Sequence, residues 1–531
     1  MSSPTEPHRV ESPPLAGRIG LFAGPLLALV VFFLLPSGDG GLSHAAKACG
    51  GVATLMAVWW MTEALPLEAT ALLPLVLLPL TGIYASDTAF KRAAAPYADP
   101  SIFLFLGGFM IALAIERWGL HRRMALLTLL AVGTSPSRLV GGFLLATALI
   151  SMWMSNTATA VMMLPIGLAV VGLLSDRLKE PAERLGELKT LTPALSQRER
   201  EPPIDNSTDA ANLATSILLA IAYAASLGGF ATLVGTPPNI YFAGYMRDQG
   251  LPIDFGRWML FATPLSFIFL FITWLLLTRW LFPVRIKQIP GGRELIESEF
   301  RKLGPVSRGE WTVLIVFACT AALWMFRGAL VEWDWLVAQL PIIQSIDDSL
   351  VAMAGAIALF LIPVDPARHV FALDWKTAVK LPWGVLLLFG GGLSLAAAMT
   401  DSGLARWIGQ QVGVLAGLPT YWQITLIVAL IVFSGELTSN LAAVVALLPI
   451  LFEVAKSLEL DPLLLCIPAV VAASCGFMLP VATPPNAIVF GSGHIKLGQM
   501  VRAGLALDLV AVVLIPLFTY LFGSAILGIR M

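Results

Sequence analysis

Charged residues are scarce in this 531-residue chain: 13% of positions are Asp, Glu, Lys or Arg, whereas 57% are hydrophobic. Soluble globular chains carry about 25% charged residues, so the composition excludes an ordinary water-soluble protein. The formal net charge is -1, and no basic stripe gives reason to expect a nucleic-acid partner.

Cysteine and histidine are also rare. The four cysteines form no Cys-x-x-Cys pair and the five histidines are scattered, which indicates neither a disulfide framework nor a zinc site. The hydrolase motifs His-Glu-x-x-His and Gly-x-Ser-x-Gly do not occur. The chain is therefore not predicted to be an enzyme, and an intramembrane hydrolase is disfavoured.

Long apolar runs are what the chain has in abundance. Runs of about 15–20 residues recur throughout, which is the length that crosses a bilayer as a helix. We predict an all-α polytopic membrane protein with about eleven transmembrane helices plus two re-entrant hairpins. The first run, near Gly20–Pro36, is long for a signal peptide and lacks a clear cleavage motif, so it is expected to be a retained helix.

Two short polar segments interrupt the apolar runs. They are WMSNTAT at 153–159 and LTSNLAA at 437–443, and each lies within a predicted hairpin, at roughly 138–173 and 420–456. Downstream of each, Pro-Pro pairs are expected to break the next helix at Gly235–Pro238 and Ala482–Pro485.

The same landmarks occur in the same order in both halves of the chain. The tripeptide and the Pro-Pro pair are 82 positions apart in the first half and 45 in the second, and the difference of 37 equals the length of the polar stretch 175–211. That proline-containing, charge-rich stretch is predicted to be a disordered loop inserted in one half. Five spans per half would place the halves in opposite orientations, which is the inverted repeat of many secondary transporters.

The polar segments are best explained as ligands. Non-helical backbone survives at membrane depth only where protein buries it or where it lines a wet cavity. Hydroxyl, amide and carbonyl oxygens suit a hard cation such as sodium, whereas the helix N-terminus after each Pro-Pro break suits an anion. Packing alone would explain one such segment, but two of them, each paired with a break, favour a binding site near mid-membrane.

Ionisable groups near the tips are few. Glu436 lies three positions before the second tip, where a buried charge is a functional hypothesis. We favour a structural role, in which its carboxylate caps freed N–H groups of the hairpin. Glu63 and Glu68, on either side of Pro66, receive the same interpretation.

The segments MWMSNTATAVMMLPI, TLVGTPPN, ELTSNLAAVVALLPI and VATPPNAIVFGSG resemble the divalent anion/sodium symporter family, and the resemblance covers residues 19–528 except the insert. It implies sodium-coupled symport of a divalent anion, such as a C4-dicarboxylate, by alternating access. It also implies a homodimer with a scaffold and an elevator-type transport domain, with sodium as coupling ion and no other cofactor.

The resemblance also implies site residues. The first sodium site would use Ser151, Ser155, Asn156 and Gly235, and the second Gly435, Thr438, Asn440 and Ala482. The substrate contacts would be Asn156, Thr157, Thr236, Pro237, Asn440, Thr483 and Pro484. Two departures are visible: Leu441 replaces the threonine of the second tripeptide, and Gly435 stands where a hydroxyl is common.

The expected organisation follows from these landmarks and from the positive-inside rule, which places the N-terminus in the cytoplasm and the C-terminus outside an inner (cell) membrane. In order it is a cytoplasmic tail (1–18), a first scaffold helix (19–45), the first inverted repeat (46–282, hairpin tip 155–157, cytoplasmic insert 175–211), a cytoplasmic linker (283–310) and the second inverted repeat (311–531, hairpin tip 438–441).

Several alternatives stay open at this point. The anion is equally a C4-dicarboxylate, citrate or sulfate, and the carrier is coupled to sodium or protons or works by exchange. A channel also lines its pore with polar groups, but two related broken-helix sites favour alternating access.

Overall fold

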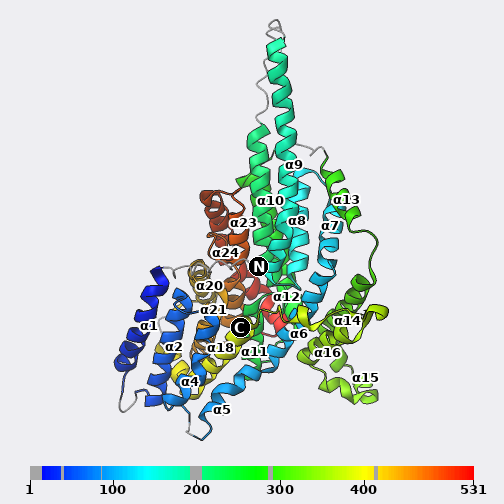
Figure 1. Ribbon diagram of the computed structural model, residues 1–531. Coiled ribbons are helices and arrows are strands. Elements are labelled where there is room, and N and C mark those ends of the chain that lie inside the picture. The colour runs from blue at the N-terminus through cyan, green and yellow to red at the C-terminus, as the bar shows by residue number, and fades with distance from the viewer. Residues whose placement is uncertain are drawn as a thin grey trace, which may run out of the picture.

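The structure is a computed structural model that describes residues 15–37, 41–84, 87–191, 206–284, 291–411 and 417–530, with residues 15, 174–191, 206 and 207 described by backbone alone. It is built almost entirely of helices (Figure 1). In the first half these are α1 (Leu15–Leu34), α2 (His44–Thr62), α3 (Leu67–Thr70), α4 (Leu73–Leu80), α5 (Ala89–Ala94), η1 (Ala95–Ala98), α6 (Pro100–Arg117), α7 (Leu120–Val132), α8 (Pro136–Ser151), α9 (Asn156–Leu191), α10 (Asn206–Gly229), α11 (Pro237–Asp248), α12 (Phe255–Leu275) and η3 (Leu276–Leu281).

The second half begins with an amphipathic helix and contains one short β-hairpin. Its elements are α13 (Gly292–Lys302), α14 (Arg308–Val331), α15 (Asp334–Gln339), η4 (Pro341–Ser345), α16 (Asp348–Leu361), β1 (Pro363–Asp365), η5 (Pro366–Arg368), β2 (Val370–Phe371), α17 (Trp375–Ala378), α18 (Trp383–Asp401), α19 (Leu404–Gln411), α20 (Thr420–Gly435), α21 (Asn440–Ser457), α22 (Pro462–Ala473), α23 (Pro484–Gly491) and α24 (Leu497–Leu527). Strands β1 and β2 pair antiparallel.

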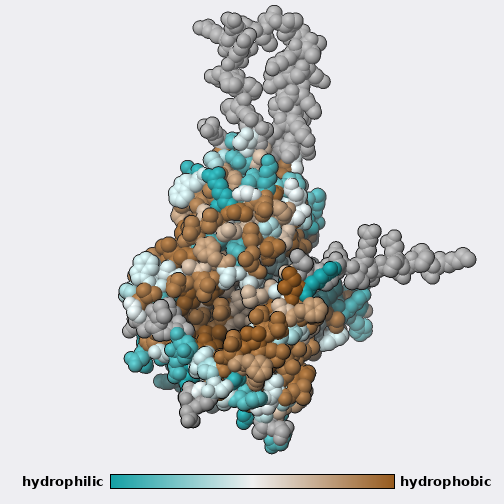
Figure 2. Space-filling model, turned by 90° about the vertical axis from the view of Figure 1, so that its left-hand side faces the viewer, coloured by the Kyte–Doolittle hydropathy of each residue, from teal (hydrophilic) through white to brown (hydrophobic). Residues whose placement is uncertain are grey.

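Nine helical segments among the described residues are long and apolar enough to cross a membrane. Shorter apolar helices accompany them, including both first arms of the hairpins, α8 and α20. In Figure 2 hydrophobic residues cover the middle of the face turned to the viewer, and hydrophilic residues gather above and below them. This distribution matches a body that lies across a bilayer with its polar ends in water.

Polar caps mark where several helices begin. The side chains of Ser43, Asp99, Asp254 and Asp461 accept hydrogen bonds from backbone N–H groups at the first turns of α2, α6, α12 and α22. Ser307 and Glu310 form a complete capping box at the start of α14, in which the side chain of each accepts from the backbone N–H of the other. These side chains satisfy N–H groups that a helix leaves unpaired at its first turn.

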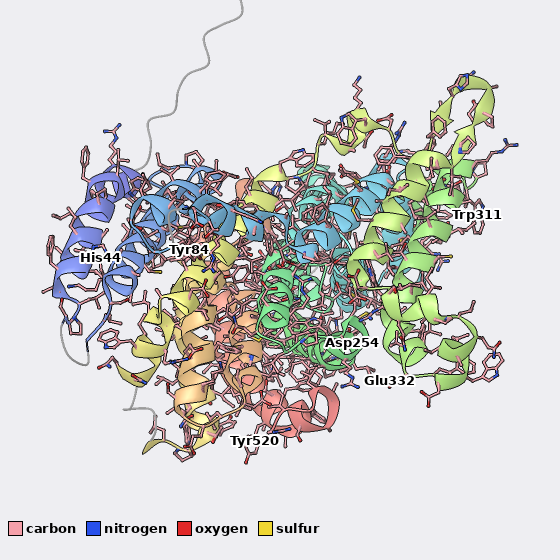
Figure 3. The ribbon with its side chains drawn as sticks, turned by 90° about the horizontal axis from the view of Figure 1, so that it is seen from below. His44, Tyr84, Asp254, Trp311, Glu332 and Tyr520 are labelled. Atoms are coloured by element: carbon pink, nitrogen blue, oxygen red, sulfur yellow. The ribbon has the colours of Figure 1, made fainter. Side chains whose placement is uncertain are left out.

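The two helices that lead into the breaks lie at the centre of the molecule. In α22 every residue from Leu463 to Ala473 is buried, and 83% of the most apolar window of α10 is buried. The helices α1 and α2 lie at one side of this centre and α14 and α16 at the other, as the labels His44 and Trp311 indicate in Figure 3. Helices that other helices surround can be interrupted without exposing backbone to lipid.

The polar stretch 175–211 differs from the prediction. Helix α9 continues through it to Leu191 and α10 begins at Asn206, so both described ends are helical rather than loop, and the two helices project beyond the bundle (Figure 1). The segment LSDRLKEPAERLGELKTL is rich in Leu, Glu, Lys, Arg and Ala, which favour helix. Residues 192–205 of the predicted loop lie outside the described residues.

The hairpin tips and the breaks are also displaced from their predicted positions. The turns comprise 152–155 and 436–439, so Asn156 and Asn440 are the first residues of α9 and α21 rather than parts of the turns. The breaks comprise 230–236 and 474–483, so each ends just before its Pro-Pro pair instead of including the pair as predicted. Proline favours the first positions of a helix, so each pair starts the second half-helix.

Glycine allows two helices of this fold to touch. A Cβ on Gly107 of α6 would lie 2.5 Å from the carbonyl carbon of Ala352 on α16, whereas a Cβ on the adjacent Gly108 would have its nearest neighbour, Val234, at 3.7 Å. The same helix therefore carries one glycine that packing requires and one that it does not.

We expect Gly107→Ala to destabilise the protein by about 1–3 kcal/mol, because α6 and α16 must move apart. Gly108→Ala is the matched control and should be neutral or slightly stabilising, since alanine favours helix. Thermal unfolding of the purified variants in detergent measures the difference. Equal unfolding midpoints for the two variants would contradict the close helix contact.

Candidate functional site

The first hairpin tip is fixed by Ser151, the last residue of α8. Its hydroxyl is fully buried and lies 2.6 Å from the carbonyl oxygen of Ala225 on α10 and 2.8 Å from Oδ1 of Asn156. It therefore joins both ends of the turn to the helix that enters the first break.

The first break is held to this tip by Thr232. Its Oγ1 donates to the carbonyl oxygen of Met152 at 2.5 Å and accepts from the N–H of Gly235 at 3.0 Å. Asn239, in the first turn of α11, donates from Nδ2 to the carbonyl oxygens of Phe230 (3.0 Å) and Thr232 (2.7 Å). Side chains thus replace the helical hydrogen bonds that the break removes.

Carbonyl oxygens converge at Gly235. A Cβ on this residue would lie 2.3 Å from the carbonyl oxygen of Gly229 and 2.9 Å from those of Ser151 and Met152. Only glycine leaves this space open, and its rim is made of oxygen atoms from the tip and the break. Such a set of neutral oxygens suits a hard monovalent cation.

The second tip is fixed by a carboxylate. Glu436 is 3% exposed, and its oxygens accept hydrogen bonds from the N–H groups of Phe477 (2.7 Å), Met478 (3.0 Å) and Leu479 (2.8 Å). A structural carboxylate was expected here, but the N–H groups that it caps belong to the facing break rather than to its own hairpin. Hydrogen bonds to an ionised acceptor are about twice as strong as neutral ones.

The second break repeats the asparagine of the first. Asn486, in the first turn of α23, donates from Nδ2 to the carbonyl oxygens of Gly476 (3.1 Å) and Leu479 (3.0 Å), and its N–H donates to Oγ1 of Thr483 at 3.3 Å. Oδ1 of Asn486 is buried without a partner among the described residues, as is Oδ1 of Asn239. Each break therefore presents one unpaired amide oxygen.

The two halves differ where Ser151 corresponds to Gly435. No hydroxyl reaches Asn440, and its buried Oδ1 has no partner in the described part of the chain. A Cβ on Gly435 would have Oδ1 of Asn440, at 3.9 Å, as its only neighbour within 4 Å. The second half thus has room for the side chain that the first half uses to tie its tip.

The structure brings most of the predicted site residues to these two tips and breaks. Ser151, Gly235, Thr236, Gly435, Ala482 and Thr483 are buried, Ser155, Asn156, Pro237, Thr438 and Asn440 are half-buried, and Thr157 and Pro484 are exposed. One of these side chains already has a backbone partner: the hydroxyl of Thr438, in the second turn, donates to the carbonyl oxygen of Ser434 on α20 at 3.0 Å.

Sequence reasoning missed the residues that hold the breaks, namely Thr232, Asn239 and Asn486. The asparagines could have been found, because each ends a Thr-Pro-Pro-Asn motif at the start of a half-helix. Thr232 had no such signal, since a lone threonine in an apolar segment is usually a packing residue.

Four helices begin at the tips and breaks: α9, α11, α21 and α23. Helix α9 packs against α23 and α11 packs against α21, so each half of the chain contributes to both pairs. None of the ion pairs found in the described residues involves 151–159, 229–239, 435–440 or 474–486. An anion here would be held by helix N-termini and bound cations rather than by a basic side chain.

The model of the sodium:sulfate symporter transmembrane region matches residues 19–529. The chain belongs to this family. Among curated relatives, the sodium-dependent dicarboxylate transporter SdcS of Staphylococcus saprophyticus is 38% identical over 96% of this chain and 92% of its own length. SdcS of Staphylococcus aureus strain MRSA252 is 39% identical with the same coverage.

Solved structures show the same fold at low sequence identity. The YdaH transporter of Alcanivorax borkumensis has a TM-score of 0.55 and 14% identity, covering 91% of this chain and 98% of its own. MtrF of Neisseria gonorrhoeae has a TM-score of 0.50 and 12% identity, covering 96% and 95%. The predicted all-α polytopic membrane fold is confirmed.

Family membership confirms the class of activity. The chain is a multi-pass membrane protein that carries a divalent anion together with sodium as the coupling ion, and it is a transporter rather than an enzyme. The resemblance drawn from the four motifs was therefore correct.

We expect Gly235→Ala to abolish sodium-dependent anion uptake, because its Cβ would fill the space between the carbonyl oxygens of the tip and the break. Gly491→Ala, at the end of α23, is the control, since a Cβ there has nothing within 4 Å. Uptake into proteoliposomes at equal protein content is the measurement. Normal sodium dependence in Gly235→Ala would rule out a cation at this position.

Proposed function

We propose that the protein imports a C4-dicarboxylate such as succinate by sodium-coupled symport. The observation that carries the proposal is the identity of 38% over 96% of the chain to sodium-dependent dicarboxylate transporters. It is supported by the two pairs of tip and break, which would offer one carboxylate position per half. Citrate and sulfate remain the alternatives within the same family.

The proposed sodium positions follow from the oxygen atoms. The first would be bounded by the Ser151 and Asn156 side chains, Ser155 and the backbone around Gly235. The second would use Gly435, Thr438, Asn440 and the Ala482 carbonyl group. The hydroxyl of Thr438 donates its proton to the carbonyl oxygen of Ser434 on α20, which would leave its lone pairs for the ion.

The substrate carboxylates would lie at the starts of the half-helices. The proposed contacts in the first half are Asn156, Thr157, Thr236 and Pro237, and those in the second half are Asn440, Thr483 and Pro484. The exposure of Thr157 and Pro484 supports contact with a soluble substrate. Bound sodium ions would offset the substrate's negative charge, which couples the two binding events.

We further propose that the two halves form an inverted repeat within a homodimer whose transport domain moves as an elevator in an inner (cell) membrane. The matching placement of Asn239 and Asn486 supports the repeat. By the positive-inside rule, Arg122, Arg123 and the linker with α13 would lie on the cytoplasmic side. This orientation would put the N-terminus in the cytoplasm and the C-terminus outside.

Uptake of radiolabelled succinate into proteoliposomes, with and without an inward sodium gradient and with citrate or sulfate as competitors, tests the proposal. We expect uptake to depend steeply on sodium, with more than one ion per anion, and excess unlabelled succinate to compete best. Equal uptake in choline and sodium buffers would exclude sodium symport. Stronger competition by sulfate or citrate than by succinate would identify that anion as the preferred substrate.

Asn156→Ala should weaken succinate and sodium binding together, because the amide would serve both ligands. Loss of a hydrogen bond to a charged group costs roughly 1.5–3 kcal/mol, so both affinities should fall by about ten-fold to a hundred-fold. Half-saturation concentrations for succinate and sodium provide the measurement. Wild-type values for both ligands would show that the tip is packing.

Gly435→Ser tests the second half in the opposite direction. The added hydroxyl has room beside Oδ1 of Asn440, so it should lower the sodium concentration needed for half-maximal uptake without changing the substrate. The same substitution at Gly491, where space is also open, is the control and should leave the sodium dependence unchanged.

A further inference from the structure

Helix α10 loses its regular hydrogen bonds where it enters the first break. The N–H of Ala231 donates to the carbonyl oxygen of Gly228 at 3.1 Å rather than to that of Leu227, which a regular α-helix would use. Phe230 and Ala231 lie beyond the last residue of α10. The carbonyl groups of Leu227, Phe230 and Ala231 are buried, so each needs a donor from elsewhere.

Helix α12 supplies these donors from three side chains. They are Trp258 Nε1, which donates to the carbonyl oxygen of Phe230 at 3.1 Å, Thr263 Oγ1, which donates to that of Ala231 at 3.1 Å, and Ser266 Oγ, which donates to that of Leu227 at 2.6 Å. A threonine within a helix commonly donates to the carbonyl group four residues before it, as Thr273 of α12 does to Phe269 at 2.8 Å. Thr263 instead donates across to the break.

One carbonyl group in this region has no donor. From Leu227 to Thr232, every carbonyl oxygen accepts a hydrogen bond from the described residues except that of Gly229. This same oxygen is the atom that a Cβ on Gly235 would meet first, before the carbonyl oxygens of the tip. The one unpaired carbonyl oxygen is therefore the one that faces the proposed sodium position.

The second break is held in another way. Among the described residues, no side chain of α24, which follows α23 as α12 follows α11, donates a hydrogen bond to 474–483. The carboxylate of Glu436 accepts hydrogen bonds from N–H groups of that break instead. Donors from the following helix are thus a feature of the first half.

The donors of α12 restrict where the Gly229 carbonyl group can point. Hydrogen bonds to Leu227 on one side, and to Phe230 and Ala231 on the other, fix the peptide groups that flank it. The Gly229 carbonyl group cannot replace them at α12, because those donors are already used. An oxygen atom that is held in place before an ion binds loses little conformational freedom on binding, which raises affinity.

We propose that the carbonyl oxygen of Gly229 is a further ligand of the first sodium position, and that Trp258, Thr263 and Ser266 are positioning residues that hold it toward the ion. The inference rests on the sodium coupling and on the first sodium position proposed above. It connects α12, which carries none of the predicted site residues, to the binding of sodium.

Thermal unfolding of the purified protein in detergent, with sodium titrated against choline at constant ionic strength, tests the proposal. A ligand that binds the folded protein raises its unfolding temperature, so the sodium concentration that gives half of this rise reports sodium affinity without transport. Thr263→Val keeps the shape of the side chain and removes its hydroxyl donor. We expect this sodium concentration to increase by about two-fold to ten-fold, which is the effect of one lost hydrogen bond.

Two further variants separate the hydrogen bonds from packing. Thr263→Ser retains the hydroxyl group and should bind sodium as the wild type does. Ser266→Ala removes the donor to Leu227 and should increase the sodium concentration in the same direction as Thr263→Val.

Thr273→Val is the matched control, because Thr273 is a buried threonine of the same helix whose hydroxyl donates only within α12. This variant should leave the sodium concentration for the half-maximal rise unchanged, even if its unfolding temperature in choline is lower. In uptake assays, Thr263→Val should need more sodium for half-maximal uptake and reach the wild-type rate at saturating sodium. A purely structural defect would lower that rate instead.

Wild-type sodium affinity in both Thr263→Val and Ser266→Ala would overturn the proposal, as would an equal change in Thr273→Val. If sodium did not raise the unfolding temperature of the wild type, the first sodium position itself would be wrong and the proposal with it. The titration contains no divalent anion, so a failure of succinate as the substrate would be recognised separately.

Discussion

Backbone hydrogen bonding within the membrane is the constraint on which the rest of this structure depends. The breaks at 230–236 and 474–483 interrupt helices at the buried centre of the molecule, where water does not compensate unpaired N–H and carbonyl groups. The chain meets this constraint with a few polar side chains. Asn239 and Asn486 bind carbonyl oxygens, and Glu436 binds N–H groups.

The same groups give the proposed binding site its ligands. Oxygen atoms remain available at the breaks and the second tip: the carbonyl oxygens around Gly235, and the amide oxygens of Asn239, Asn440 and Asn486, which have no partner among the described residues. Neutral oxygens that are buried and held in place are what a sodium ion needs to replace its hydration shell. The half-helices that restart at the Pro-Pro pairs supply the complementary donors for an anion. In the proposed site, the side chains that satisfy the broken backbone and the atoms that bind ligands thus belong to one set of residues.

Much of the fold was visible in the sequence because apolar run lengths and proline positions act locally. The Pro-Pro pairs start helices as proline chemistry requires. What the sequence did not reveal depends on contacts between distant segments. The N–H groups that bind Glu436 lie 41 to 43 positions away from it in the sequence. The loop prediction was wrong for the two described ends of the polar insert, because charge was given more weight than helix-forming composition.

The central claim is that sodium and a divalent anion bind to one site made from two tips and two breaks. The most direct measurement is the affinity of the purified protein for succinate by calorimetry across sodium concentrations, with choline keeping the ionic strength constant. The account predicts that affinity rises steeply with sodium, with a logarithmic slope above one, and that binding is lost in choline alone. Equal succinate affinity in choline and in sodium would contradict it.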